Sequence, residues 1–342
     1  MTKALLPLEV LLRQACESFP NDFPYPGQDY FGRYYSVKEW LGIHVYPHIG
    51  SGLSAGGGIY TSHGSDHFDE VIRYAGLLIG AEENCMPSRI APYELYVLLM
   101  SILLHDAGNV FGRDRHEKRP FELLSDMGEL AGSDNFEKRA IALVAEAHGG
   151  MTKNGDKDTI SNLYEQNNQG HVSFRGRLIA AILRFADEIC EHRGRGARIL
   201  LNRGALPPES EIFHLYAESI TAVRVDRKSK TINITYDVSV SDATRRWGKN
   251  NGNAYITEEI LLRLEKMNLE RVYCMRFMYE VVTIQRIAAT VSIVDRQFNV
   301  LEQYAVTLED LGYPVANAAL LARHPDLAGS SVCERFKDSA SD

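Results

Sequence analysis

Apolar residues in the first 200 positions recur every three or four residues, in runs that begin or end at glycine, proline or a short polar residue. This spacing predicts amphipathic helices, because an α-helix completes one turn in about 3.6 residues. The glycine-rich stretch 20–64 interrupts the pattern and is expected to be a surface loop. The predicted helices cover residues 5–19, 65–80, 92–108, 119–131, 135–148 and 173–193.

The pattern changes beyond residue 219. Ile220–Val225 and Thr231–Val238 alternate apolar and polar residues on either side of a polar turn, which predicts a β-hairpin. Helical spacing returns over Tyr255–Met278, and the β-branched residues of Thr283–Val294 are typical of a further strand. This part of the chain is therefore expected to mix helices and strands.

The change of pattern predicts a domain boundary near residue 200. We expect a mainly α fold, with a helical domain over residues 1–200 and a smaller α+β region over residues 201–342. A chain of 342 residues is long enough for two domains of modest size. The tail near 330–342 is mostly small and polar, so we expect it to be disordered.

Composition and charge narrow the class of protein. Hydrophobic residues make up 45% and charged residues 24% of the chain, which excludes a disordered, collagen-like or coiled-coil protein. The net charge is −8, whereas nonspecific nucleic-acid-binding proteins are more often basic, so we expect no such binding. No apolar run approaches the ~20 residues of a membrane span. We therefore expect no membrane partner. The five cysteines are scattered without a CxxC pair, which favours reduced thiols in a cytoplasmic protein.

Strongly apolar segments of this chain end in polar side chains that could bind metal. Val97–Asp106 is almost entirely apolar but ends in adjacent His105 and Asp106, and Leu178–Asp187 ends in a carboxylate in the same way. A buried ionised carboxylate is costly unless it is paired or bound to a metal ion. His67 lies on the apolar side of a third predicted helix. Such mixed nitrogen and oxygen donors suit Mn, Fe, Co, Ni, Zn or Mg and do not choose among them.

The order of these residues resembles that of the HD superfamily of metal-dependent phosphohydrolases. The pattern H…HD…H…D covers roughly residues 60–195, with HFDEVIRYAG at its first histidine, LLHDAGN at the doublet and LRFADE at its last aspartate. The resemblance implies an HD-type helical bundle. It implies that one metal ion is held by His67, His105, Asp106 and Asp187, and that His116 and His148 match the further histidines of the two-metal branch, with Asp106 bridging.

Two of these histidines keep alternative interpretations. His148 ends a predicted helix and could be an ordinary C-terminal capping histidine. His116 could be a ligand, a substrate contact or a solvated loop residue, and as a residue beside the metals it is our candidate proton donor, catalytic together with Asp106.

Three arginines are candidates for substrate binding. Arg113 and Arg115 follow the doublet, and Arg184 lies one helical turn before Asp187. Guanidinium groups beside a metal centre suit a phosphate substrate, although a solvated run of charges would have the same sequence.

The resemblance implies hydrolysis of a nucleotide by attack of metal-activated hydroxide on phosphorus, with one or two divalent ions as cofactors and manganese as the first to test. A (deoxy)nucleoside triphosphate is the favoured substrate. The alternatives are a phosphodiesterase of a cyclic nucleotide or short oligonucleotide, and a non-catalytic nucleotide-sensing HD module. Analogy with HD proteins of bacterial conflict and signalling systems adds a nucleotide effector, a homo-oligomer and a role in antiviral defence as open expectations.

Overall fold

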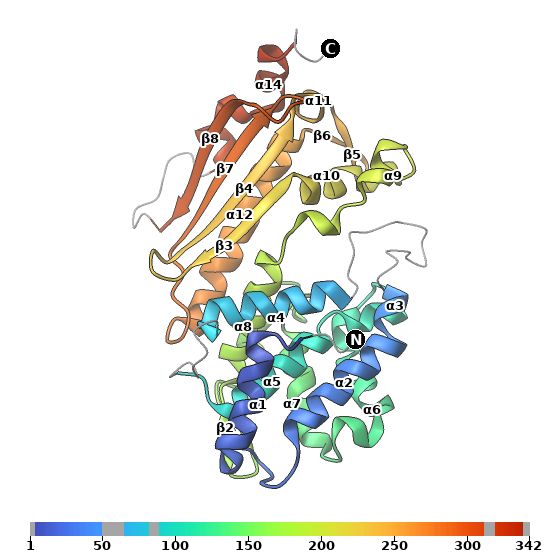
Figure 1. Cartoon of the computed structure of the whole chain (residues 1–342), viewed down its shortest axis with the longest axis vertical. Helices are drawn as coiled ribbons and strands as arrows, with labels where there is room; N and C mark the ends of the chain where they lie inside the picture. The colour runs from blue at the N-terminus through green and yellow to red at the C-terminus, as the bar shows by residue number, and fades with distance from the viewer. Residues whose placement is uncertain (1–3, 50–64, 82–88, 311–318, 338–342) are drawn as a thin grey trace. The chain divides into compact units, whose positions relative to one another are not determined.

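The computed structural model describes residues 4–49, 65–81, 89–310 and 319–337, which form two units. Among these residues, the first unit comprises 4–49, 65–81, 89–190 and 273–283, and the second comprises 191–272, 284–310 and 319–337. The first is built almost wholly from helices, and the second contains the main sheet (Figure 1). The predicted mainly α fold, with a smaller part that contains strands, is confirmed.

The central element of the first unit is α5 (Pro92–Leu104), which is buried from Tyr93 to Leu104. It packs against α1, α2, α4, α7 and α8 (Figure 1). A helix surrounded in this way must be apolar on every side, which explains its sequence. The other elements are α1 (Pro7–Ser18), α2 (Tyr30–His44), α3 (Tyr46–Ile49), α4 (Ser65–Ile79), α6 (Pro120–Asp126), α7 (Asn135–Glu146), β1 (Asn167–Gln169), β2 (Val172–Phe174) and α8 (Gly176–Ile189).

The central helix also bears on the expectation of no membrane-spanning segment. By length and composition alone, Pro92–Phe111 is apolar enough to cross a membrane. However, 83% of its most apolar stretch is buried inside the protein. The core helix of a helical bundle has the same composition, so this segment gives only weak support for a span.

Helix α2 corrects the prediction of a loop over residues 20–64. Tyr30, Tyr34, Val37 and Leu41 are spaced as on one helix face and are at most 1% exposed. The side chain of Asp29 caps the helix by accepting a hydrogen bond from the Gly32 N–H at 2.7 Å. The glycines that suggested a loop, at positions 50–58, lie outside the described residues.

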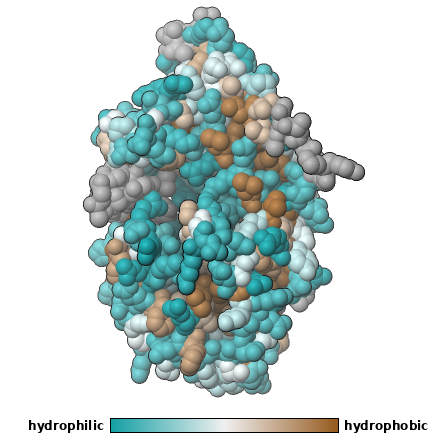
Figure 2. Space-filling model, turned by 180° about the vertical axis from the view of Figure 1, so that it is seen from behind, coloured by the Kyte–Doolittle hydropathy of each residue, from teal (hydrophilic) through white to brown (hydrophobic). Residues whose placement is uncertain are grey.

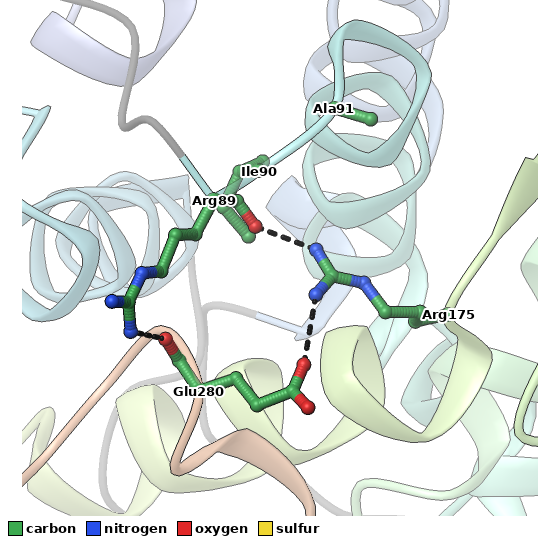
Figure 3. Close-up of a pocket in the computed structure, with 5 residues that line it drawn as sticks. All are labelled: Arg89, Ile90, Ala91, Arg175 and Glu280. Carbon is green, nitrogen blue, oxygen red and sulfur yellow. Dashed lines mark hydrogen bonds and ion pairs between the residues drawn. The ribbon is translucent and has the colours of Figure 1, made fainter.

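Arg175 fastens the start of α8 to the start of α5. Its guanidinium donates to both carboxylate oxygens of Glu94, at 2.9 and 2.8 Å, and to the Arg89 carbonyl at 2.6 Å. Figure 3 shows it also reaching Glu280, at 3.3 Å. The helices contain 13 and 14 residues, so their C-terminal ends, which carry His105 and Asp187, also meet.

The second unit contains a four-stranded sheet in the order β3-β4-β7-β8. Strands β4 and β7 pair in parallel, and the two outer pairs are antiparallel. The predicted hairpin, long helix and following strand are present as β3 (Ile220–Asp226), β4 (Thr231–Ser239), α12 (Ile256–Met278) and β7 (Arg286–Val294). The end of α12, from Tyr273 on, belongs to the first unit. The elements not predicted are α9 (Arg198–Asn202), α10 (Glu211–Ser219), α11 (Val240–Ala243), β5 (Trp247–Lys249), β6 (Gly252–Ala254), β8 (Val300–Glu309) and α13 (Leu320–Arg323).

The C-terminal tail is ordered further than its composition predicts. Helix α14 covers Gly329–Arg335, and Val332 and Phe336 are buried. These two apolar residues lie four positions apart and so share one face of the helix, which anchors the segment. The prediction of disorder from residue 330 is therefore wrong as far as residue 337, where the description ends. The domain boundary near residue 200 stays a prediction.

Replacing Arg175 by alanine should lower the free energy of unfolding by about 1–3 kcal/mol, because it leaves the carboxylate of Glu94, which is 3% exposed, short of hydrogen-bond donors. Urea unfolding measures the effect. Arg119→Ala is the control, since Arg119 and Glu122 form a pair that is 46% exposed on each side and should contribute less than about 1 kcal/mol. Equal losses in the two variants would contradict the role of Arg175.

Candidate metal centre

Six predicted site residues converge in the first unit from five segments. His67 lies in the first turn of α4, His105 and Asp106 follow α5, and Asp187 lies in the last turn of α8. His148 follows α7, and His116 begins a short 3₁₀ helix, His116–Lys118. His67, His105, Asp106 and His148 are buried, whereas the side chain of His116 is 21% exposed.

Four donor atoms form the first half of the cluster. The Nε2 atoms of His67 and His105 lie 3.4 Å apart, and each is 3.3 to 3.6 Å from Oδ1 of Asp187. Oδ2 of Asp106 lies 3.9 and 3.8 Å from the same two nitrogens. Donors about 2.1 Å from a shared ion in tetrahedral arrangement lie about 3.4 Å from one another. The set therefore fits one divalent ion.

The other oxygen of Asp106 belongs to the second half. Its Oδ1 lies 3.0 Å from Nε2 of His116 and 3.5 Å from Nε2 of His148. Asp106, His116 and His148 thus form a second group of suitable donors, which shares only Asp106 with the first. A carboxylate that presents one oxygen to each group has the arrangement of a bridging ligand.

Backbone contacts leave the Nε2 atoms of three histidines available. The Nδ1 atoms of His105, His116 and His148 lie 2.8, 3.0 and 2.7 Å from the carbonyl oxygens of Ile102, Arg113 and Ala145. A carbonyl only accepts, so each Nδ1 carries the hydrogen, and the Nε2 lone pair of the neutral ring faces the cluster. Partners of this kind orient histidine ligands in metal proteins.

The electrostatics of the cluster favour a cation. Burial alone would lower the pKa of His105, but the carboxylates of Asp106 and Asp187 outweigh it and raise the pKa to about 9. Burial alone would raise the pKa of Asp187, but hydrogen bonds from His105 and His67 hold it well below its usual range. Burial alone would also lower the pKa of His116, but the hydrogen bond to Asp106 and its negative charge raise it. Without a metal ion the carboxylates attract protons to the histidines instead.

Gly108 allows His116 to reach the cluster. A Cβ atom on Gly108 would lie 2.1 Å from the carbonyl oxygen of His116 and 2.8 Å from Cβ of Arg119. A glycine is therefore needed for the turn that carries His116 to pack over the end of α5. An ion pair between Lys118 and Glu146, at 2.7 Å, joins the same turn to α7.

The three candidate substrate arginines differ in their surroundings. Arg113 and Arg115 are exposed beside His116, and Arg115 has a positive φ of 53°. Arg184 is buried, donates to the Lys157 carbonyl and the Thr159 hydroxyl, and lies over the ring of Tyr273. These contacts give Arg184 a structural role, and substrate binding by all three arginines stays a prediction.

Cys190 and Glu117 are contacts of the cluster that the sequence did not reveal. The Sγ atom of Cys190 lies 3.7 Å from Nδ1 of His67, in the position that a carbonyl takes for the other histidines. A carboxylate oxygen of Glu117 lies 3.7 Å from Nδ1 of His116. The sequence showed only an isolated thiol three residues after Asp187 and an acid within a run of charges.

The bundle and its ordered His and Asp cluster define a protein with an HD-type metal site, as the sequence predicted. A family model described as HD-CE matches residues 58–266, more than half of the chain and a range that includes all six clustered residues. The chain therefore belongs to the HD-CE family. Searches of curated proteins and of solved structures gave no match. The HD-type domain and the donor set together indicate a metal-dependent hydrolase.

Metal content should distinguish the two halves of the cluster. Asp106→Ala should remove bound metal from both, whereas Gly108→Ala should displace His116 and remove only the second ion. Inductively coupled plasma mass spectrometry of the purified variants measures the content. Gly42→Ala is the matched control, because a Cβ at this helical glycine meets nothing within 4 Å. Full metal content in Asp106→Ala would refute the site.

Chelation should destabilise the protein more at pH 9 than at pH 6.5. In the metal-free protein the pKa of His105 is raised from 6.5 to about 9. The protonated ring therefore stabilises the folded state fully below pH 6.5, and this stabilisation is lost as the pH rises through 9. Asp187 stays ionised throughout this range and adds no pH dependence. Metal ions should bind more tightly as protons leave, which offsets the loss. Melting temperatures with EDTA and with manganese test this; a chelator effect that does not grow with pH would contradict it.

Proposed function

We propose that this protein is a metal-dependent phosphohydrolase that acts on a nucleotide, with a (deoxy)nucleoside triphosphate as its first candidate substrate. The observation that carries the proposal is the placement of Asp106, whose two carboxylate oxygens face two separate groups of histidines. Two adjacent divalent ions are typical of enzymes that displace an oxygen at phosphorus.

The residues of the chain divide the work as follows. His67, His105 and Asp187 would hold one ion, His116 and His148 the other, and Asp106 both. Divalent ions in such a site polarise phosphoryl oxygens and lower the pKa of a bound water toward neutrality. Asp106 fixes the spacing of the two halves, and the buried α5 holds Asp106 in place.

His116 has a second candidate role as the proton donor to the leaving oxygen. It is more exposed than the other histidines described in the cluster, and its raised pKa favours the protonated ring. One Nε2 atom cannot hold an ion and donate a proton at the same time, so the two roles are alternatives. The position of Nε2 3.0 Å from Asp106 favours the ligand.

A phosphodiester is the second candidate substrate, and the size of a groove beside α7 is compatible with it. The groove has a volume of about 1220 Å³ and is lined by residues next to His116 and His148. Small-molecule sites usually enclose about 300–1,000 Å³, so a short oligonucleotide would fit as well as a mononucleotide. Effector nucleotides, assembly into homo-oligomers and a choice of manganese stay predictions.

A panel of nucleotides identifies the reaction. The protein is incubated with manganese and each nucleotide, and the products are identified by mass spectrometry. Release of intact triphosphate, release of orthophosphate and conversion of a cyclic nucleotide to a linear one each indicate a different reaction. Asp106→Ala should lower turnover about 10³-fold, because the charge that holds both halves is lost. The exposed Asp126→Ala, on α6, should leave turnover unchanged.

His116→Gln separates the two roles of that residue. A fall in metal content would assign it as a ligand, and a 10²- to 10⁴-fold fall in kcat with metal retained, roughly the size of a general-acid effect, would assign it as the proton donor. An absence of turnover by metal-loaded protein on the whole panel would refute the hydrolase and leave a nucleotide-sensing module.

A further inference from the structure

A groove runs beside α7 and is lined in part by the segments that carry His116 and His148. We call it the α7 groove; among the residues that line it are Lys118, Leu143, Lys153, Asn162 and Tyr164. Two other lining residues are sequence neighbours of the histidines: Glu117 follows His116, and Ala147 precedes His148. The groove is therefore built in part by the two segments that carry the histidines of the second half, although His116 and His148 are not among its lining residues.

Several side chains in the α7 groove have unused binding capacity. Tyr164 is 79% exposed, and its hydroxyl makes no hydrogen bond with the described part of the chain. The side chains of Asn162 and Lys153 are likewise exposed and have no polar partner among residues 4–49, 65–81, 89–310 and 319–337. An aromatic ring, an amide and an ammonium group are thus available to a ligand.

The groove offers apolar surface together with these polar groups. Leu143 and Met151 line it and are 36% and 59% exposed. Lys118 is paired with Glu146. The other exposed charged residues of the lining are three basic ones, Arg115, Arg139 and Lys153, and one acidic one, Asp114, so this surface is positively charged. A surface of this composition suits a ligand that is flat and apolar in one part and anionic in another.

We propose that the α7 groove binds the nucleoside part of the substrate and that Tyr164 stacks on its base. The proposal rests on the proposed function, because the metal cluster accounts for the phosphates and leaves the base and sugar to be recognised elsewhere. Base stacking on an aromatic side chain tolerates every base, and Asn162 can add hydrogen bonds to a base edge.

The size of the groove supports this choice of ligand. A site that bound only inorganic phosphate or tripolyphosphate would need no exposed aromatic ring and no volume of about 1220 Å³. The nucleoside therefore accounts for the aromatic, amide and apolar groups together, whichever phosphorus bond is cleaved.

Saturation-transfer NMR with deoxyadenosine, which has no phosphorus bond to cleave, tests the contact without turnover. With the magnesium-loaded protein the base protons should receive saturation from wild type, and Tyr164→Ala should weaken binding by about tenfold, the size expected for loss of a stacked base. Tyr164→Phe should retain the signal because it keeps the ring. Tyr279→Ala is the matched control, since Tyr279 is 61% exposed and is absent from the lining of this groove.

A kinetic comparison gives the second readout. Tyr164→Ala should raise KM for the nucleotide about tenfold and leave the inhibition constant of tripolyphosphate unchanged, because tripolyphosphate has no base to stack. Base signals that are absent from wild type, or equal in wild type and Tyr164→Ala, would overturn the proposal. Base signals that disappear in Tyr164→Ala while wild type hydrolyses nothing would support the groove and refute the proposed hydrolase, so the two failures are distinguishable.

Discussion

The carboxylate of Asp106 is the group on which the candidate centre depends. It follows the most deeply buried helix of the first unit, and its two oxygens face different groups of histidines. A buried carboxylate is unfavourable unless positive charge or hydrogen-bond donors surround it. Binding of a divalent ion at the end of α5 therefore stabilises a carboxylate that burial would otherwise disfavour. A metal site explains why this apolar helix is followed by His105 and Asp106.

The alignment of α5 and α8 carries this constraint through the bundle. Both helices start at the Arg175–Glu94 contact, and their nearly equal lengths bring Nε2 of His105 within 3.6 Å of Oδ1 of Asp187 at the far end. A shift of one residue along either helix would move a ligand by about 1.5 Å and rotate it by about 100°. The Arg175–Glu94 pair thus contributes to the alignment of the two helices that carry ligands, although it supplies no ligand itself.

The sequence predicted the ligands that lie on long helices better than their surroundings. His67, His105, Asp106 and Asp187 stand out because polar residues interrupt apolar helical segments. The place of His116 was left open, because it depends on the close approach of a turn to Gly108, which no periodic pattern records. Helix α2 was hidden by neighbouring glycines, and α14 is held by two apolar residues in a polar tail. The face in Figure 2 is mostly hydrophilic, with apolar residues gathered in patches. A single exposed aromatic residue such as Tyr164 leaves no periodic signal in the sequence.

Helix ends add a further contribution that favours cations over anions at this site. His105, His148 and Asp187 lie at or just beyond the C-terminal ends of α5, α7 and α8. The last carbonyl groups of a helix lack intrahelical partners and give this end a partial negative charge. The histidine Nδ1–H groups satisfy some of these carbonyls, and the remaining field of three converging ends has the same sign as the two carboxylates. The binding of metal ions and the orientation of their histidine ligands are therefore two consequences of the same helix ends, and a phosphate could approach this negative site only when ions bound there reverse its charge.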